Sequence, residues 1–219
     1  MAAKRTAQKN VSPKPARDPE RTRARILAAA KDEFAAHGLG GARVDRIAAN
    51  ADANKRMLYY YFGNKDALFL AVLEAAYAHI RAAEIALHLT ELDPPEAIRR
   101  LIAFTWDYYL KHPEFMTLLN SANLHQARHL KQSSTVRNMH SPFVAMIEEI
   151  LERGRKMGVF RAGVDPVQLY ISIASLTYFY LGNKYTLSAI FGRDLLAPRA
   201  KAERLAHMSE LVLGYLFKT

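Results

Sequence analysis

The stretch "NKRMLYYYFGNKDAL", residues 54–68, places two cations beside three tyrosines and a phenylalanine. A hydrophobic core accommodates the rings but not Lys55 and Arg56, whereas a solvated surface accommodates the cations but not four consecutive aromatic residues. A short helix over residues 55–62 accommodates both, because residues four apart lie on the same helical face.

On that helix, Leu58 and Phe62 are predicted to face inward. The outer face then carries two pairs of a cation and a tyrosine, Lys55 with Tyr59 and Arg56 with Tyr60. Ammonium, guanidinium and phenol groups can all reach phosphates and base edges in a DNA groove. The helix is therefore a candidate for contact with nucleic acid.

Two further helices are predicted before this one. An Asp-Pro pair at residues 18–19 is a helix start, and apolar residues at helical spacing continue to Gly38. Residues 39–41 are expected to form a loop, residues 43–51 a two-turn helix and residues 52–54 a tight turn. Two short helices joined in this way are typical of a helix-turn-helix, whose second helix enters the DNA major groove.

The rest of the chain is also predicted to be helical. Asn64 caps a long helix from Lys65 to about Leu87. Further helices are expected over residues 95–111, 113–124, 136–157, 165–181 and 201–217. The predicted fold class is all-α, with about nine helices. A three-helix head with the helix-turn-helix, residues 18–64, precedes a larger C-terminal helical bundle, residues 65–219.

Positive charge is concentrated in the first third of the chain. The formal net charge is +10, and residues 1–70 hold 14 Lys and Arg against 7 Asp and Glu. Residues 71–219 hold 17 against 14. A localised positive field favours a polyanion such as double-stranded DNA. Residues 1–17 are predicted to be a disordered basic arm, which either follows a phosphate backbone or serves only as a solubilising tail.

Two absences narrow the class of protein. The chain has no cysteine, which excludes disulfides and cysteine-based metal sites and fits a reducing cytoplasm. Its longest strongly apolar stretch, Leu169–Leu181, is shorter than the roughly 18 residues that a membrane span needs. We therefore expect a cytoplasmic protein with no membrane partner.

The run "RARILAAAKDEFAAHGLGGARVDRIAANADANKRMLYYYFGNKDAL", residues 23–68, resembles the N-terminal domain of tetracycline-repressor-type (TetR-type) regulators. The positions that match the family pattern are Phe34, Gly38, Val44, Ile47, Ala48, Ala51, Leu58, Tyr59, Phe62, Lys65 and Leu68. A later segment, "YLGNKYTLSAIFGRDL" at residues 180–195, resembles C-terminal domains of that family less strongly. The resemblance implies a homodimeric DNA-binding repressor, released from a pseudo-palindromic operator by a small effector.

The resemblance also implies roles for individual residues of the head. Tyr59 and Lys65 would hold phosphates, and Arg43 would clamp the DNA backbone. Lys55, Arg56 and Tyr60 would face the groove and determine sequence preference.

Three positions depart from the family pattern. The family usually has Thr near Ala42, Gly at Asp52 and Ser at Asn54. The missing Thr removes one phosphate contact. Asp tolerates left-handed backbone better than most residues, so the turn is expected to persist at Asp52.

In this family the C-terminal body dimerises, and the sequence supports this role independently. Residues 165–181 and 201–217 carry apolar side chains on more than one helical face, so one face is available for a partner subunit. The candidate interface residues are Leu169, Ile173, Leu176, Leu205, Met208, Leu211, Val212 and Tyr215. The alternative is that these are central helices, buried on every side.

The body of the family also holds the effector. Aromatic side chains and amides cluster about the helix junction at His112-Pro113 and on the next long helix. The candidate ligand-binding residues are Trp106, Tyr109, Phe115, Met116, Asn120, Asn123, Phe143 and Met146. Apolar walls with a few amides suit a small, largely apolar effector, although the same residues could form an ordinary core.

Other functions have weaker support in the sequence. His125 and His129 have the spacing of two metal ligands on a helix, but no third ligand is apparent. The chain has no nucleophile elbow and no glycine-rich phosphate loop, so we expect neither catalysis nor a cofactor. A helical-bundle enzyme and a protein-binding module with a basic head remain the alternatives.

Overall fold

The computed structural model describes residues 18–218, so the basic arm expected over residues 1–17 lies outside it. Its described part contains ten α-helices and no β-strand, which confirms the all-α fold class. The helices are α1 (Pro19–Gly41), α2 (Val44–Asn50), α3 (Lys55–Phe62), α4 (Lys65–Ile85), α5 (Pro94–Lys111), α6 (Pro113–Leu124), α7 (Ser134–Lys156), α8 (Pro166–Gly182), α9 (Lys184–Phe191) and α10 (Pro198–Leu216). None of these helices is long and apolar enough to cross a membrane.

The number of helices differs from the expected nine because of α9. This eight-residue helix follows Asn183, where a Gly-Asn pair ends α8. Five of its eight residues are apolar or aromatic, with Leu187, Ile190 and Phe191 at helical spacing, yet none of its side chains is buried.

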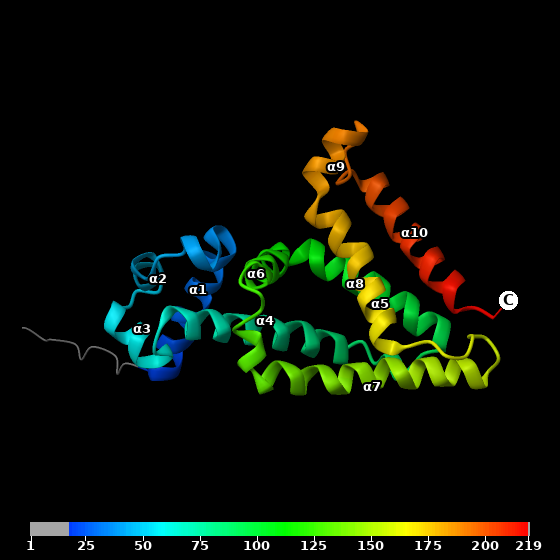
Figure 1. Cartoon of the computed structure of the whole chain (residues 1–219), viewed down its shortest axis with the longest axis horizontal. Coiled ribbons are helices and arrows are strands. Elements are labelled where there is room, and N and C mark those ends of the chain that lie inside the picture. Colours follow the sequence, from blue (N-terminus) through cyan, green and yellow to red (C-terminus); the bar gives the residue numbers. More distant parts are fainter. Residues whose placement is uncertain (1–17, 219) are drawn as a thin grey trace, which may run out of the picture.

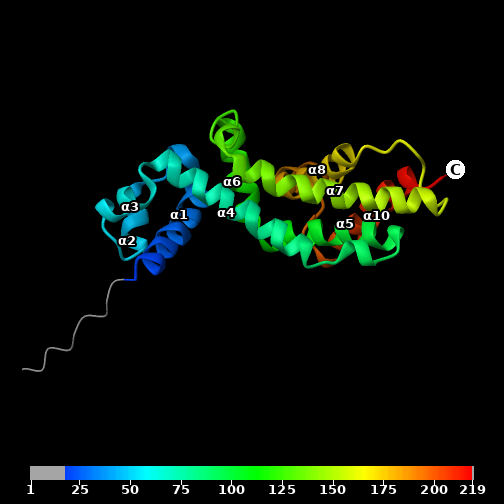
Figure 2. The ribbon, with the colours of Figure 1, turned by 90° about the horizontal axis from the view of Figure 1, so that it is seen from below.

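The first three helices form a head at one end of the molecule (Figure 1). Helix α4 runs from this head into the body, where it lies beside α7 in both views (Figures 1 and 2). Helix α1 packs against α6, so the head also touches the body away from α4. The head is therefore joined to the body at two places, through the continuous helix α4 and through the contact of α1 with α6.

Two hydrophobic cores correspond to the head and the body. The head core includes Leu58 and Phe62 of α3 together with Leu68 and Phe69 of α4. The body core includes Ile80, about two turns beyond Leu73, the last α4 residue buried in the head core. One helix thus contributes to both cores and connects them.

Helix α1 does not end cleanly at Gly38. That glycine has φ 62° and ψ 177°, which breaks the helix, but residues 39–41 return to a helical turn instead of the expected loop. The turn is fixed because the Leu39 N–H donates to Ser121 Oγ of α6 at 2.9 Å. A contact across 82 residues thus decides this local conformation.

Gly154 of α7 provides a test of the body core. A Cβ at this position would lie 2.1 Å from Cδ2 of Phe160, whose ring is buried beneath the helix. We expect Gly154→Ala to lower the free energy of unfolding by about 1–3 kcal/mol, because the ring must move in a close-packed core. Urea denaturation followed by circular dichroism measures the change. Gly40→Ala, where no atom lies within 4 Å of the new Cβ, is the matched control. A Gly154→Ala variant as stable as the parent would contradict the packing.

Candidate functional site

The turn between α2 and α3 is built by backbone geometry and one cap. Asp52 adopts φ 46°, the left-handed conformation expected for the position where the family usually has glycine. The Ala53 N–H donates to the Ala48 carbonyl at 2.9 Å, and the Asn54 side chain accepts from the Met57 N–H at 2.9 Å. The turn therefore accommodates Asp52 and Asn54, the two residues here that depart from the family pattern. Helix α3 begins directly after it, at Lys55.

Helix α3 has one buried and one exposed face, as the sequence predicted. Leu58 is fully buried and Phe62 nearly so. On the opposite side Tyr59 is 48% and Tyr60 79% exposed. Lys55 and Arg56, at the start of the helix, are also exposed. The Tyr60 ring meets that of Tyr61 edge to face at 5.2 Å but is otherwise exposed, which leaves most of it available to a partner.

The cations of this surface differ in how far their charge is neutralised. Asp45 of α2 forms ion pairs with Lys55 and, at 3.7 Å, with Arg43. The hydrogen bond from Lys55 is the largest cause that holds the pKa of the Asp45 carboxyl below its usual value. Arg56 and Lys65 have no ion-pair partner within residues 18–218. Asp45 was missed by the sequence analysis, since only the packing of α2 against α3 brings it to Lys55.

Lys65 is the first residue of α4, where helix N–H groups favour anions. The neighbouring Asp66 accepts hydrogen bonds from His129 Nε2 at 2.7 Å and from Arg128 at 3.0 Å. The bond with His129 is the largest cause of a lowered pKa at Asp66. His129 thus ties the segment between α6 and α7 to the start of α4. Among the described residues, no group of three or more His, Cys, Asp or Glu could hold a metal ion.

Glu33 joins α1 to the start of α2. Its buried carboxylate accepts hydrogen bonds from the Arg43 backbone N–H at 2.8 Å and from Arg46 at 2.8 and 2.6 Å. The hydrogen bonds from Arg46 are the largest cause of its lowered pKa. This acid in an apolar stripe gave no signal in the sequence, yet it orients the helix on which α3 rests.

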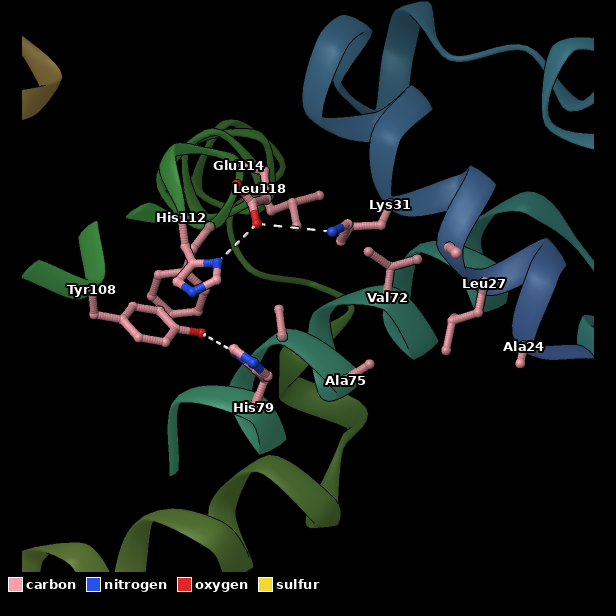
Figure 3. Close-up of a pocket in the computed structure, with 13 residues that line it drawn as sticks. Ala24, Leu27, Lys31, Val72, Ala75, His79, Tyr108, His112, Glu114 and Leu118 are labelled. Carbon is pink, nitrogen blue, oxygen red and sulfur yellow. Dashed lines mark hydrogen bonds and ion pairs between the residues drawn. The ribbon is translucent and has the colours of Figure 1, made fainter. Parts of the chain in front are cut away.

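A cavity of about 340 Å³ lies at the junction of head and body (Figure 3). Helices α1, α4, α5 and α6 line it. Lys31 of α1 approaches Glu114 of α6 at 3.8 Å, and His112 Nδ1 lies 3.2 Å from the same carboxylate. On the other wall, His79 Nδ1 lies 2.7 Å from the Tyr108 hydroxyl. Polar contacts therefore connect the head to the body across this cavity.

A second cavity, of about 510 Å³, lies between α4 and α7 within the body. Phe143 and Met146, two of the expected ligand-binding residues, line it together with Arg81. Phe115, a third, lines the junction cavity instead.

The other five expected ligand-binding residues line neither cavity. Trp106, Tyr109 and Met116 are buried in the body core. Asn120 and Asn123 are exposed on α6, where Asn120 accepts a hydrogen bond from Tyr178 and Asn123 donates to the Leu119 carbonyl at 3.0 Å. The eight residues therefore do not converge on a single cavity.

The expected interface residues of α8 and α10 divide by burial. Four are buried in the body core, two are partly buried, and Leu211 and Tyr215 are 47% and 50% exposed. The buried four are Leu169, Ile173, Met208 and Val212, and the partly buried two are Leu176 and Leu205. A groove of about 460 Å³ runs between the two helices.

Further apolar side chains are exposed on α8. We call Val167, Ile171, Phe179, Leu211 and Tyr215 the α8–α10 face. Exposed apolar patches are typical of interaction surfaces, which makes this face a candidate for one.

A helix-turn-helix head with an exposed cationic and aromatic second helix, on an all-helical body that shares α4, defines the class of two-part DNA-binding regulators. Comparison with known protein families supports this class. Residues 26–72 match the family described as "Bacterial regulatory proteins, tetR family", and residues 94–212 match "Tetracyclin repressor-like, C-terminal domain". The chain belongs to the TetR family of transcriptional regulators.

Individual relatives support this assignment. The HTH-type transcriptional repressor NicS of Pseudomonas putida is 43% identical over 198 residues, which cover 90% of this chain and 93% of the relative. The repressor SCO4008 of Streptomyces coelicolor is 48% identical over 104 residues, 48% of this chain and 50% of the relative. The crystal structure of the regulator SCO4942 of Streptomyces coelicolor has a TM-score of 0.66 and 28% identity, and covers 89% of this chain and 98% of that chain. These relatives are transcriptional regulators and not enzymes.

Proposed function

We propose that the chain is a homodimeric repressor whose two heads bind a pseudo-palindromic operator and release it when a small effector occupies the body. Residues 18–64 would form the DNA-binding part and residues 65–219 the dimerisation and effector part. The single observation that carries this function is the outward face of α3, where Tyr60 is 79% exposed and Arg56 has no ion-pair partner in the described chain.

The roles of the head residues follow from their positions. Arg56 and Tyr60 would read base edges in the major groove, and Tyr59 and Lys65 would hold phosphates. Lys55 and Arg43 would contact DNA with a charge that Asp45 partly neutralises. We therefore rank Arg56 above Lys55 as a determinant of sequence preference.

Dimerisation would use the α8–α10 face. Its exposed apolar side chains are continuous with the groove between the two helices, and the same helices from a second copy could pair with them as a four-helix interface. Two heads joined in this way would reach successive major grooves about one helical turn apart.

Effector release requires a ligand that prefers the conformation in which the heads misfit DNA. Helix α4 is suited to transmit such a preference, since it lines both cavities and contributes to both cores. A structural relative, FadR of Bacillus subtilis, was crystallised with stearoyl-CoA, and a chain of this fold can thus hold a ligand. We propose a smaller, largely apolar effector for the present chain.

The proposed function is tested by presenting the purified, unliganded protein with sheared DNA from its source at about physiological salt and sequencing the retained fragments. We expect a compact set of fragments that share a two-fold symmetric motif, because two identical heads read two half-sites. Diffuse retention that disappears as salt rises would contradict the proposal, because non-specific binding is dominated by phosphate charge.

Lys65→Ala is expected to weaken binding to operator and random DNA about equally. Each lost phosphate contact makes the slope of log K against log salt less steep by about 0.9, and a dimer that loses two contacts therefore loses nearly two units of slope. Fluorescence anisotropy at several salt concentrations measures the slope, and Lys111→Ala on α5, exposed in the body, is the control. A slope equal to that of the parent would exclude Lys65 from the phosphate contacts.

A further inference from the structure

Arg81 of α4 is buried in an aromatic surrounding deep in the body. Only 4% of the residue is exposed. Its guanidinium carbon lies 3.9 Å from the centre of the Phe143 ring and 5.4 Å from that of Tyr170, and Nη2 donates to the Tyr170 hydroxyl at 3.2 Å. A charge taken out of water to this extent is costly unless it is paired and hydrogen-bonded.

The pairing of Arg81 within the protein is incomplete. Glu84, one turn further along α4 and 1% exposed, has Oε2 at 2.9 Å from Arg81 Nε. The two atoms are not aligned for a hydrogen bond, and Arg81 Nη1 has no hydrogen-bond partner among the described residues. Burial raises the pKa of Glu84 to about 8, against the opposing effect of Arg81. Burial thus disfavours the ionised form of the acid that is paired with Arg81, and two of the three guanidinium nitrogens, Nε and Nη1, have no hydrogen-bond partner among the described residues.

The cavity between α4 and α7 brings this group into contact with a ligand-sized space. Arg81 lines the cavity of about 510 Å³, within the range of small-molecule sites. The other walls are mainly apolar, with Ile85, Phe143 and Met146 among them. Arg81 is the only lining residue with a permanent charge, because the only other ionisable one is His88. A single cation on apolar walls matches one negative charge on an apolar body.

We propose that this cavity binds a small monocarboxylic acid, whose carboxylate pairs with Arg81 and whose apolar body lies against Phe143 and Met146. A planar guanidinium engages a carboxylate through two parallel hydrogen bonds, and Nη1, which is buried without a partner in the unliganded chain, would gain one when the Arg81 side chain turns toward the cavity. A ligand with two or more charges would leave one uncompensated in this site, and a neutral ligand would leave Arg81 as it is. The proposal rests on the proposed function, since it names the chemical class of the effector.

The test measures binding directly, with no DNA present. Benzoate, cyclohexanecarboxylate and octanoate are titrated into the full chain by isothermal calorimetry, with benzamide as the neutral counterpart of benzoate. We expect at least one acid to bind and benzamide not to bind. Arg81→Met, which keeps an apolar side chain of similar length, is expected to weaken acid binding by about tenfold to a hundredfold.

Two variants separate this result from loss of folding. Arg204→Met removes a half-buried arginine of α10 whose Nε also has no hydrogen-bond partner among the described residues. No residue of α10 lines the cavity, so this variant is expected to keep acid binding. Arg81→Lys keeps the charge but not the planar pair, and is expected to bind more weakly than the parent and more tightly than Arg81→Met. Circular dichroism shows whether each variant is folded. If Arg81→Met does not fold, the acid affinity of Arg81→Lys tests whether Arg81 binds the carboxylate.

Three outcomes would overturn the proposal: no acid binds at millimolar concentration, benzamide binds as tightly as benzoate, or the folded Arg81 variants bind the acid like the parent. Operator release, measured separately, distinguishes this failure from that of the proposed function. A neutral compound that releases operator equally from the parent and from Arg81→Met would refute the monocarboxylate site and leave the repressor function intact.

Discussion

Arg56→Ala is expected to reduce operator affinity by roughly 30-fold to 20,000-fold while it leaves binding to random DNA nearly unchanged. A good contact between an arginine and a base is worth about 1–3 kcal/mol of discrimination, and a dimer loses two of them. The residue is exposed at the start of α3 and, unlike Lys55, has no acidic partner in the described chain, so its guanidinium is available for a base edge.

The measurement is the ratio of affinities for the operator and for a scrambled duplex at one salt concentration. Arg100→Ala, an exposed arginine of α5, changes the net charge equally and is expected to leave the ratio intact. Equal loss on both duplexes would identify Arg56 as a phosphate contact, and an unchanged ratio would remove it from the recognition surface. Tyr60→Ala tests the neighbouring position in the same way.

The second large effect concerns the α8–α10 face. Leu211→Glu is expected to convert the dimer into a monomer and to lower operator affinity by about 10²–10⁴-fold, because the second head then loses its effective concentration at the second half-site. The leucine is 47% exposed, so the substitution leaves the core of the monomer intact. In a two-fold interface each glutamate would lose water without gaining a partner, which is costly.

Sedimentation equilibrium at micromolar concentration measures the mass of the variant. Met157→Glu places the same side chain at an exposed apolar position after α7, outside the proposed face, and is expected to remain dimeric. If Leu211→Glu and Ile171→Glu both sediment as dimers, the interface lies elsewhere. If the parent is a monomer that binds operator as tightly, the dimeric mechanism itself is wrong.

The head could be predicted in detail because its determinants are local. Leu58 and Phe62 share a face at helical spacing, and the same spacing places Tyr60 on the other side, so burial and exposure follow from the sequence alone. The start of α1 is similarly local, since the Asp18 side chain accepts from the backbone N–H groups of Glu20 and Arg21.

The body was less predictable, because an apolar side chain at helical spacing can line a core, a cavity or a partner's surface. Trp106 and Phe143 gave the same signal in the sequence and both belong to the body core, yet Phe143 also borders the cavity between α4 and α7. On α10, Met208 is fully buried whereas Leu211, one turn later, is half exposed. Periodicity gives the number of apolar faces, and only the neighbouring helices decide what each face contacts.

The sequence by itself therefore determined the all-α fold, the helix-turn-helix and the outward face of α3, since these depend on caps, turns and spacings within a few residues. The tertiary structure alone decided that Asp45 neutralises part of the Lys55 charge and that Asp66 is held by His129, 63 residues away. It also placed Arg81 against Phe143 and Tyr170 beside a cavity. Such contacts depend on how the helices pack, because the side chains that meet are brought together by distant parts of the chain.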